Sequence, residues 1–211
     1  MQIDVWSDVA CPWCYLGKRR LAGALASSGL QAEVIWHAFE LAPELPPAGL
    51  PIDDWLGKRY PKPQLDQMHA RMTAMGKDAG IDFQFDKRTR AANTRLAHRA
   101  IAIARELGGA ALQNAVVEAC FHANFTAGVD IANRDALIDA LAPTGIDTES
   151  LRTKLSGTDA LETVLEDERV AARIGITGVP FFIARGKLAM SGAQAPDVFA
   201  GFLAKARELA A

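Results

Sequence analysis

The chain has 211 residues, of which 50% are hydrophobic and 23% are charged. That length favours one domain with room for an insertion, and such a chain buries enough apolar surface to fold without a disulfide or a metal. The proportion of charged residues excludes wholesale disorder. The net charge of −2 argues against a nucleic-acid partner, because there is no excess of basic residues to attract phosphates.

No apolar run reaches the roughly 18 residues that a membrane span needs, so we expect no membrane partner. Residues 1–8 lack the basic and apolar regions of a secretory signal, and we therefore expect a cytoplasmic protein. Three cysteines, Cys11, Cys14 and Cys120, are too few for a disulfide framework in a chain of this size. Two of them are close enough in sequence to indicate redox chemistry.

The N-terminal part of the sequence predicts a β-α-β unit. Residues 2–6 alternate weakly and predict a strand. Pro12 suits the first turn of a helix that continues to about Ser27 and ends at Gly29. Residues 31–38 predict a second strand, and a helical crossover of this length favours parallel pairing of the two strands.

The middle of the chain is predicted to be helical after an irregular connector. Six prolines in residues 42–63 indicate a connector without regular structure. From about Leu65 to Ile174, apolar residues recur at three- and four-residue steps, which is typical of helices. The predicted helices cover about 65–75 (closed by Gly76 and Gly80), 96–107, 112–121, a short segment after Asn133, and 159–174.

Strand character returns near the C-terminus. Residues 179–190 contain two short apolar runs separated by Arg185-Gly186, which predicts a hairpin. Pro196 then begins a last helix that continues to Leu209. The predicted order is therefore β-α-β, a helical block, and β-β-α.

Cys11 and Cys14 form a C-x-x-C pair that directly follows the first predicted strand and begins its helix. Both thiols then share one turn at a helix N-terminus, where unpaired N–H groups and the helix dipole favour an anion. We predict that Cys11 is the thiolate nucleophile and that Cys14, more buried, attacks the mixed disulfide that Cys11 forms. This spacing lets the second sulfur reach the first without backbone rearrangement.

A zinc site is one alternative, because Cys11, Cys14, Cys120 and His122 would supply four ligands in number. However, the two side chains of a C-x-H pair on a helix point about 200° apart, since each residue turns ~100°. We therefore expect no metal and interpret Cys120 as a small hydrophobic residue on the apolar side of a helix. Two accidental cysteines are the other alternative, which the strand-to-helix context disfavours.

Residues 8–18, DVACPWCYLGK, resemble the DsbA-like thioredoxin-fold oxidoreductases, specifically their FrnE-like branch. Similar segments follow in order along nearly the whole chain: WHAFEL (36–41), NTRLAH (93–98), GITGVPFF (175–182) and SGAQ (191–194). This branch looks related to 2-hydroxychromene-2-carboxylate isomerases and kappa-class glutathione transferases.

The resemblance implies an α/β thioredoxin fold with a large all-helical insertion, which agrees with the predicted order of elements. The thioredoxin-like domain would comprise residues 1–45 and 175–211, and residues 46–174 would form the connector and the inserted helical domain. It also implies a cis Val179–Pro180 peptide against the Cys11 sulfur, where the backbone of Val179 pairs with an extended substrate. A strand-start proline is the alternative for Pro180.

Several other residues are candidates for substrate binding. Pro12 and Trp13 lie between the two thiols, and we expect Trp13 to be exposed and to contact apolar groups. Gln194, near the start of the last helix, is a candidate for holding a carboxylate. His98 either lines the cleft or is a hydrogen-bonded histidine between domains. His37 stands where the resemblance leads us to expect Arg in many relatives, and we interpret it as a surface histidine.

We therefore predict a thiol-disulfide oxidoreductase that acts as a dithiol-disulfide reductase or isomerase. Its partners would be a thiol- or disulfide-containing protein or small molecule and a recycling reductant, because net oxidation is harder in a reducing cytosol. We expect no bound cofactor, and glutathione stays open as a co-substrate. The alternatives are a glutathione-dependent isomerase or transferase, which Cys14 argues against, and a non-enzymatic binding module.

Overall fold

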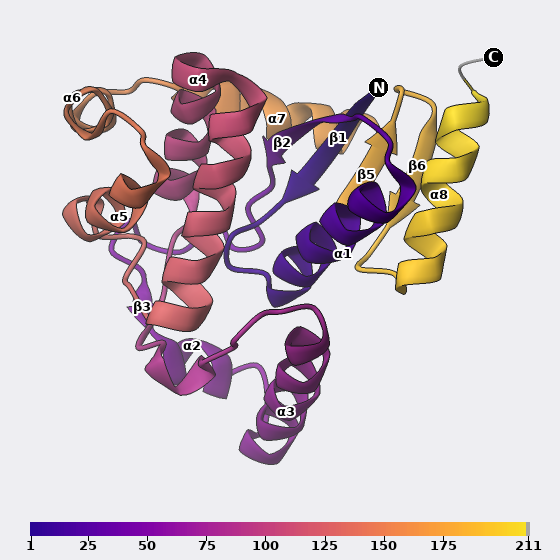
Figure 1. The fold of residues 1–211 in the computed structure, drawn as a ribbon. Coiled ribbons are helices and arrows are strands. Elements are labelled where there is room, and N and C mark those ends of the chain that lie inside the picture. Colours follow the sequence, from indigo (N-terminus) through magenta and orange to yellow (C-terminus); the bar gives the residue numbers. More distant parts are fainter. Residues whose placement is uncertain (210–211) are drawn as a thin grey trace.

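The computed structural model describes residues 1–209 and contains a four-stranded mixed sheet in the order β2-β1-β5-β6 (Figure 1). β1 (Gln2–Ser7) pairs in parallel with β2 (Glu33–Ala38) and antiparallel with β5 (Phe181–Ala184), which pairs antiparallel with β6 (Leu188–Ser191). The predicted β-α-β and β-β units and the parallel pairing are confirmed. The hairpin loop comprises residues 185–187, between the paired Ala184 and Leu188, and has positive φ at Arg185 and Gly186.

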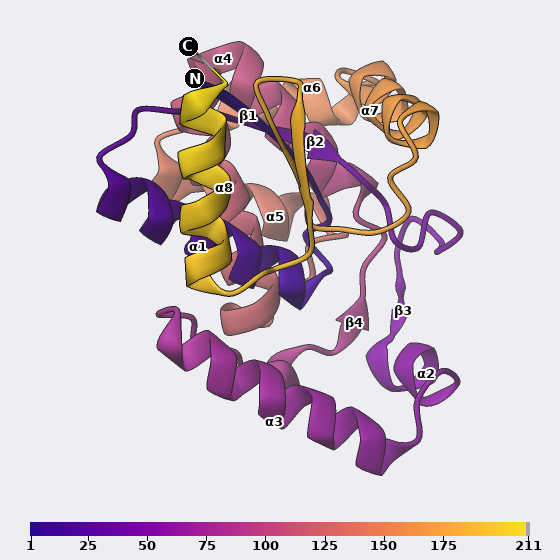
Figure 2. The same ribbon diagram turned by 90° about the vertical axis from the view of Figure 1, so that its right-hand side faces the viewer.

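Two helices cover one face of the sheet. α1 (Pro12–Ser28) and α8 (Pro196–Glu208) lie side by side on it (Figures 1 and 2). Alternate residues of β5 face opposite ways: Phe182 packs edge-to-face on Phe199 of α8, with ring centroids 5.2 Å apart. Phe181 and Ile183 instead join a smaller apolar cluster around Trp6 on the other face.

The long helix α4 (Arg95–His122) lies along β2, which is an edge strand. Gln113 of α4 donates to the Trp36 carbonyl at 2.8 Å and accepts from the Trp36 N–H at 3.1 Å. Its buried amide thus occupies hydrogen-bonding groups that a neighbouring strand would otherwise use. α4 also packs against α7 (Leu161–Arg173), which in turn contacts β2. The inserted helices are thereby fixed to the sheet.

The connector prediction is wrong in its middle part. Residues 42–63 contain α2 (Ile52–Gly57) and β3 (Leu50–Pro51), which pairs with β4 (Arg90–Ala91). Pro51 can lie in this strand because both strands of a two-stranded sheet are edge strands, where a missing N–H donor costs no hydrogen bond. α3 (Lys62–Asp78) includes Gly76 and ends shortly before Gly80, the two glycines that were predicted to close it. α2 and α3 lie at the end of the molecule to which the N-terminus of α1 points (Figures 1 and 2).

The remaining helices are short. The predicted separation of two helices in residues 96–121 is confirmed by non-helical backbone at Gly108 and Gly109 inside α4. α6 (Thr148–Ser156) was not predicted, because its mixed polar sequence gives only two buried leucines, Leu151 and Leu155. No helix within residues 1–209 is long and apolar enough to cross a membrane. The other elements are α5 (Arg134–Leu141), α6 (Thr148–Ser156), two 3-10 helices, η1 (Phe85–Lys87) and η3 (Ala142–Thr144), and a π-helical turn, η2 (Ala123–Ala127).

Candidate active site

The two cysteines of the C-x-x-C pair occupy the first turn of α1. Cys11 has extended backbone (φ −95°, ψ 113°) and is the N-cap residue, followed by Pro12 in the first helical turn. The N–H of Cys11 donates to the Asp8 carbonyl at 3.0 Å, and the N–H of Cys14 donates to the Cys11 carbonyl at 3.0 Å. Both are free thiols, with Cys11 6% exposed and Cys14 fully buried. The predicted order of burial is thus present.

The surroundings of Cys14 oppose its ionisation. Burial raises the pKa of Cys14 well above its ordinary value, and the neighbouring Cys11 adds to this effect. The backbone N–H of Asp8 and the hydroxyl of Ser7 act in the opposite direction, because each can donate a hydrogen bond to a thiolate. The Ser7 hydroxyl is buried and has no other hydrogen-bond partner among the described residues. Ser7 is therefore available to a negative charge on Cys14.

The loop before β5 closes over the thiols. The Val179–Pro180 peptide is cis, and the Val179 carbonyl lies 3.9 Å from the Cys11 Sγ, which donates to it. Pro180 packs on α1 where Gly17 leaves room: a Cβ at Gly17 would lie 2.9 Å from the Pro180 Cγ. This role of Gly17 was not predicted, although a glycine inside a predicted helix can indicate close approach of another segment.

Asp8, three residues before Cys11, is almost completely buried. Its carboxylate accepts the N–H groups of Ala10 at 3.0 Å and Leu41 at 2.7 Å. His98 lies beside it, with Nε2 3.6 Å from Asp8 Oδ1. Burial opposes the charge on the imidazole, but Asp8 raises the pKa of His98 overall. His98 is only 4% exposed and does not line the cavity, and its contact with Asp8 agrees with the alternative of a buried, paired histidine.

A cavity of about 480 Å³ opens in front of Cys11. Trp13 forms part of its wall, and α2 and α3 supply apolar side chains opposite. Trp13 is half-buried rather than exposed as expected, because the Arg71 guanidinium lies 6.0 Å from its ring centroid and α3 covers that side. Two methionines of α3 line the cavity, of which Met72 is buried and Met68 is exposed.

Three other singled-out residues lie away from this cavity. The Gln194 side chain donates to the Ser191 carbonyl at 2.8 Å and does not line the cavity. His37 is not a surface histidine: its Nδ1 lies 2.7 Å from Asp167 and its Nε2 3.0 Å from Asp4, with Trp6 stacked on the ring. Burial raises the pKa of Cys120 to about 12, and its thiol is fully enclosed in the core.

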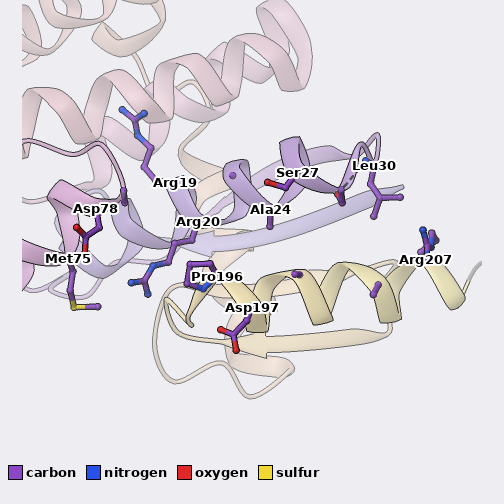
Figure 3. A pocket seen from close by; sticks show the side chains of 15 residues that line it. Arg19, Arg20, Ala24, Ser27, Leu30, Met75, Asp78, Pro196, Asp197 and Arg207 are labelled. Atoms are coloured by element: carbon purple, nitrogen blue, oxygen red, sulfur yellow. Dashed lines mark hydrogen bonds between the residues drawn. The ribbon is translucent and has the colours of Figure 1, made fainter.

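No group of three or more His, Cys, Asp and Glu side chains in the described part of the chain is arranged to hold a metal ion. A larger hollow of about 870 Å³ lies between α1 and α8 (Figure 3). Charges of both signs line it, including Arg20 and Asp197, but none of the thiols does. The chemistry of the C-x-x-C pair thus points to the smaller cavity as the candidate active site.

A DsbA-like thioredoxin domain matches residues 2–204. The chain belongs to this family. The structure of a "probable DsbA oxidoreductase" from Streptomyces coelicolor has a TM-score of 0.90 and 30% identity, with 99% of this chain and 90% of that chain covered. The predicted thioredoxin fold with a helical insertion is therefore confirmed, and family membership supports an oxidoreductase.

Two more distant structures share the fold. A 2-hydroxychromene-2-carboxylate isomerase has a TM-score of 0.73 at 21% identity, covering 99% of this chain and 96% of that one. The cytosolic disulfide reductase DsbM from Pseudomonas aeruginosa has a TM-score of 0.69 at 21% identity, covering 99% and 100%. At this identity the two similarities concern the fold alone.

Proposed function

We propose that this member of the DsbA-like family is a dithiol-disulfide reductase or isomerase that works through Cys11 and Cys14. The observation that carries the proposal is the arrangement of the two sulfurs. Cys11 lies at the N-terminus of α1, beside the cavity, and Cys14 is buried one turn further in. The unpaired N–H groups and dipole of the helix terminus favour negative charge at Cys11. Sequential disulfide exchange needs a nucleophilic thiol beside the substrate cavity and a second thiol that is shielded from solvent.

In the reductive direction, the Cys11 thiolate attacks one sulfur of the substrate disulfide and releases the other as a thiolate. Cys14 then loses its proton and attacks the Cys11 sulfur, which releases the second substrate thiolate. Two electrons pass to the substrate, and the enzyme is left with a Cys11–Cys14 disulfide. A dithiol reductant must restore the thiols. The burial that raises the pKa of Cys14 keeps it protonated until the mixed disulfide forms.

The loop containing Val179 and Pro180 would shape the substrate groove in this proposal. The backbone of Val179 faces the Cys11 sulfur, so an extended disulfide-bearing segment can lie alongside it. Pro12 and Trp13 would contact the groups next to the substrate sulfur. The proposal includes a catalytic domain that comprises residues 1–45 and 175–211. It also includes membership of the FrnE-like branch and a cytoplasmic location, where a reducing thiol pool favours reductase or isomerase work.

The test compares disulfide reduction, in the presence of a dithiol reductant, by the wild type, Cys11→Ser and Cys14→Ser. We expect loss of turnover in both variants. Cys120→Ala is the matched control, because its enclosed thiol takes no part and turnover should stay near that of the wild type. Full turnover in either active-site variant would contradict the proposal.

A glutathione-dependent isomerase or transferase is the second candidate. It is favoured by the fold shared with the 2-hydroxychromene-2-carboxylate isomerase and by a structure of DsbM with glutathione, at 21% identity. Such an enzyme needs no resolving thiol. Glutathione-dependent isomerisation that persists in Cys14→Ser and is lost in Cys11→Ser would select this candidate over the first.

A further inference from the structure

The wall of the cavity beside Cys11 is apolar but carries an uneven set of charges. Its apolar part includes Trp13, Trp55 and Met68. Among the described residues that line it, three are arginines, Arg59, Arg71 and Arg88, and Asp8 is the one carboxylate. With a volume of about 480 Å³, the cavity has the size of a small-molecule site rather than of a protein interface.

One carboxylate faces three guanidinium groups, so the cavity wall has more positive than negative side chains. Both oxygens of Asp8 are already occupied by the N–H groups of Ala10 and Leu41, and His98 lies against it from the far side. Two of the arginines are also engaged: the Arg59 guanidinium lies over the Trp55 ring, and Arg71 faces Trp13. The third guanidinium of the cavity wall belongs to Arg88.

Arg88 is a half-buried cation that makes no ion pair among residues 1–209. Its Nε donates to Asn124 Oδ1 at 3.1 Å, and its guanidinium lies 4.7 Å from the Phe125 ring centroid. Asn124 is held in place because its amide also donates to the Val9 carbonyl at 2.9 Å. Burial lowers the pKa of Arg88 to about 10, with Asp8 acting in the opposite direction. The cost of burying this charge is offset best by an anion.

The geometry of Arg88 suits a planar anion. Asn124 fixes the inner edge of the guanidinium, and its two terminal nitrogens make no hydrogen bond to any described residue. These two donors can bind both oxygens of a carboxylate at once. The same cavity wall holds Cys11 and Trp13. A carboxylate on Arg88 would thus belong to a molecule whose apolar part reaches the reactive sulfur.

We propose that the substrates are small disulfides or thiols in which an apolar, aromatic-sized group bears a carboxylate, with Arg88 binding the carboxylate and the apolar group lying against Trp13. This inference rests on the proposed dithiol function. Cys11 attacks the bound disulfide, the first substrate thiolate leaves, and Cys14 displaces the second, so that the prereduced enzyme supplies both electrons.

The experiment is a single turnover of prereduced enzyme with two aromatic disulfides, the anionic dithiobis(nitrobenzoate) and the neutral dithiodipyridine. Comparing each variant with the wild type for each probe cancels the intrinsic reactivity of the probes. In Arg88→Gln we expect the second-order rate constant to fall about tenfold or more for the anionic probe, the loss of one charge-assisted bidentate contact. For the neutral probe we expect a change of no more than about twofold. Arg173→Gln, at an exposed position on α7, is the matched control and should leave both rates unchanged.

Equal losses for both probes, or no loss for either, would overturn the role of Arg88. Failure of the wild type to release two thiols from the neutral probe would instead overturn the dithiol function. A measurement on the wild type alone covers the case in which Arg88→Gln does not fold. Benzoate should slow alkylation of Cys11 and benzamide should not, and equal effects of the two would refute an anion site.

Discussion

His37 lies between two carboxylates, and this arrangement should make the stability of the fold depend on pH. Both ring nitrogens have an acidic partner, Asp167 at 2.7 Å and Asp4 at 3.0 Å. Burial opposes the charge, but the two carboxylates raise the pKa of His37 to about 9, from an ordinary value of 6.5. A pKa raised on folding stabilises the folded state, because the protonated imidazole is held more tightly there than in the unfolded chain.

The contribution follows from the separation of the two pKa values. Each unit is equivalent to about 1.4 kcal/mol, so the charged imidazole stabilises the fold by about 3 kcal/mol at most. Because the folded pKa is the higher one, this stabilisation is fully present below a pH of 6.5 and disappears as the pH rises through about 9. Asp4, whose pKa is lowered by His37 despite the opposing effect of burial, stays ionised across this range.

The assay is urea denaturation of the wild type and of His37→Gln at about pH 6 and about pH 10, values on either side of this range. The free energy of unfolding of the wild type should exceed that of the variant by up to about 3 kcal/mol more at the lower pH than at the higher one. His122→Gln, at an exposed position, controls for the loss of an imidazole. An identical difference between wild type and His37→Gln at both pH values would show that the charge on His37 does not stabilise the fold.

Three further predictions concern α1 and the thiols. Gly17→Ala should lower the free energy of unfolding by about 1–2 kcal/mol in thermal or urea unfolding, because the new Cβ would lie 2.9 Å from Pro180. The control is Gly23→Ala in the same helix. Because a Cβ there has nothing within 4 Å, it should raise the free energy of unfolding by about 0.5–1 kcal/mol. A stabilising Gly17→Ala would contradict the close approach of α1 and the proline loop. Glu118→Ala should cost about 3 kcal/mol in urea unfolding, because it leaves the buried Lys18 ammonium, now 2.9 Å from Glu118, without its carboxylate. Glu106→Ala, which breaks an exposed pair with Lys154, is the control and should change little, and equal effects of the two would count against a buried network. Ser7→Ala should slow release of the second substrate thiol about tenfold while leaving the first release unchanged, measured by stopped-flow absorbance, because the donor to the Cys14 thiolate is lost. A slowed first step with a normal second one would show that Ser7 serves Cys11 instead.

The local elements of the fold were predictable where one residue type has one strong structural consequence. Pro12 at the start of α1, Gly29 at its end and the positive φ of Gly186 in the hairpin all follow from backbone sterics that the sequence displays directly. The position of the C-x-x-C pair at the N-terminus of a helix could likewise be predicted from the residues around it. These features depend on a few neighbouring residues only.

The features that depend on distant partners were not predictable. His37 was expected at the surface, because nothing in residues 31–38 indicates that Asp167, far along the chain, lies against it. The partner of His98 is also distant in sequence. Its contact with Asp8 forms only when α4 packs against the sheet domain. Arg88 sits in a segment without apolar periodicity, so no sequence signal marks it as a cavity residue. The roles of these three residues depend on contacts with residues far away in the sequence. The local hydrophobic pattern carries no information on such contacts.

In the proposed function, Cys11 attacks the substrate and Cys14 completes the exchange. The most direct measurement is peptide mass spectrometry of prereduced Cys14→Ser and Cys11→Ser after reaction with dithiodipyridine. The account predicts a stable adduct on residue 11 of Cys14→Ser, rapid formation of a Cys11–Cys14 disulfide in the wild type, and no comparable adduct in Cys11→Ser. An adduct that forms equally fast on Cys14 of the Cys11→Ser variant, or a wild type that retains the probe on Cys11, would contradict it.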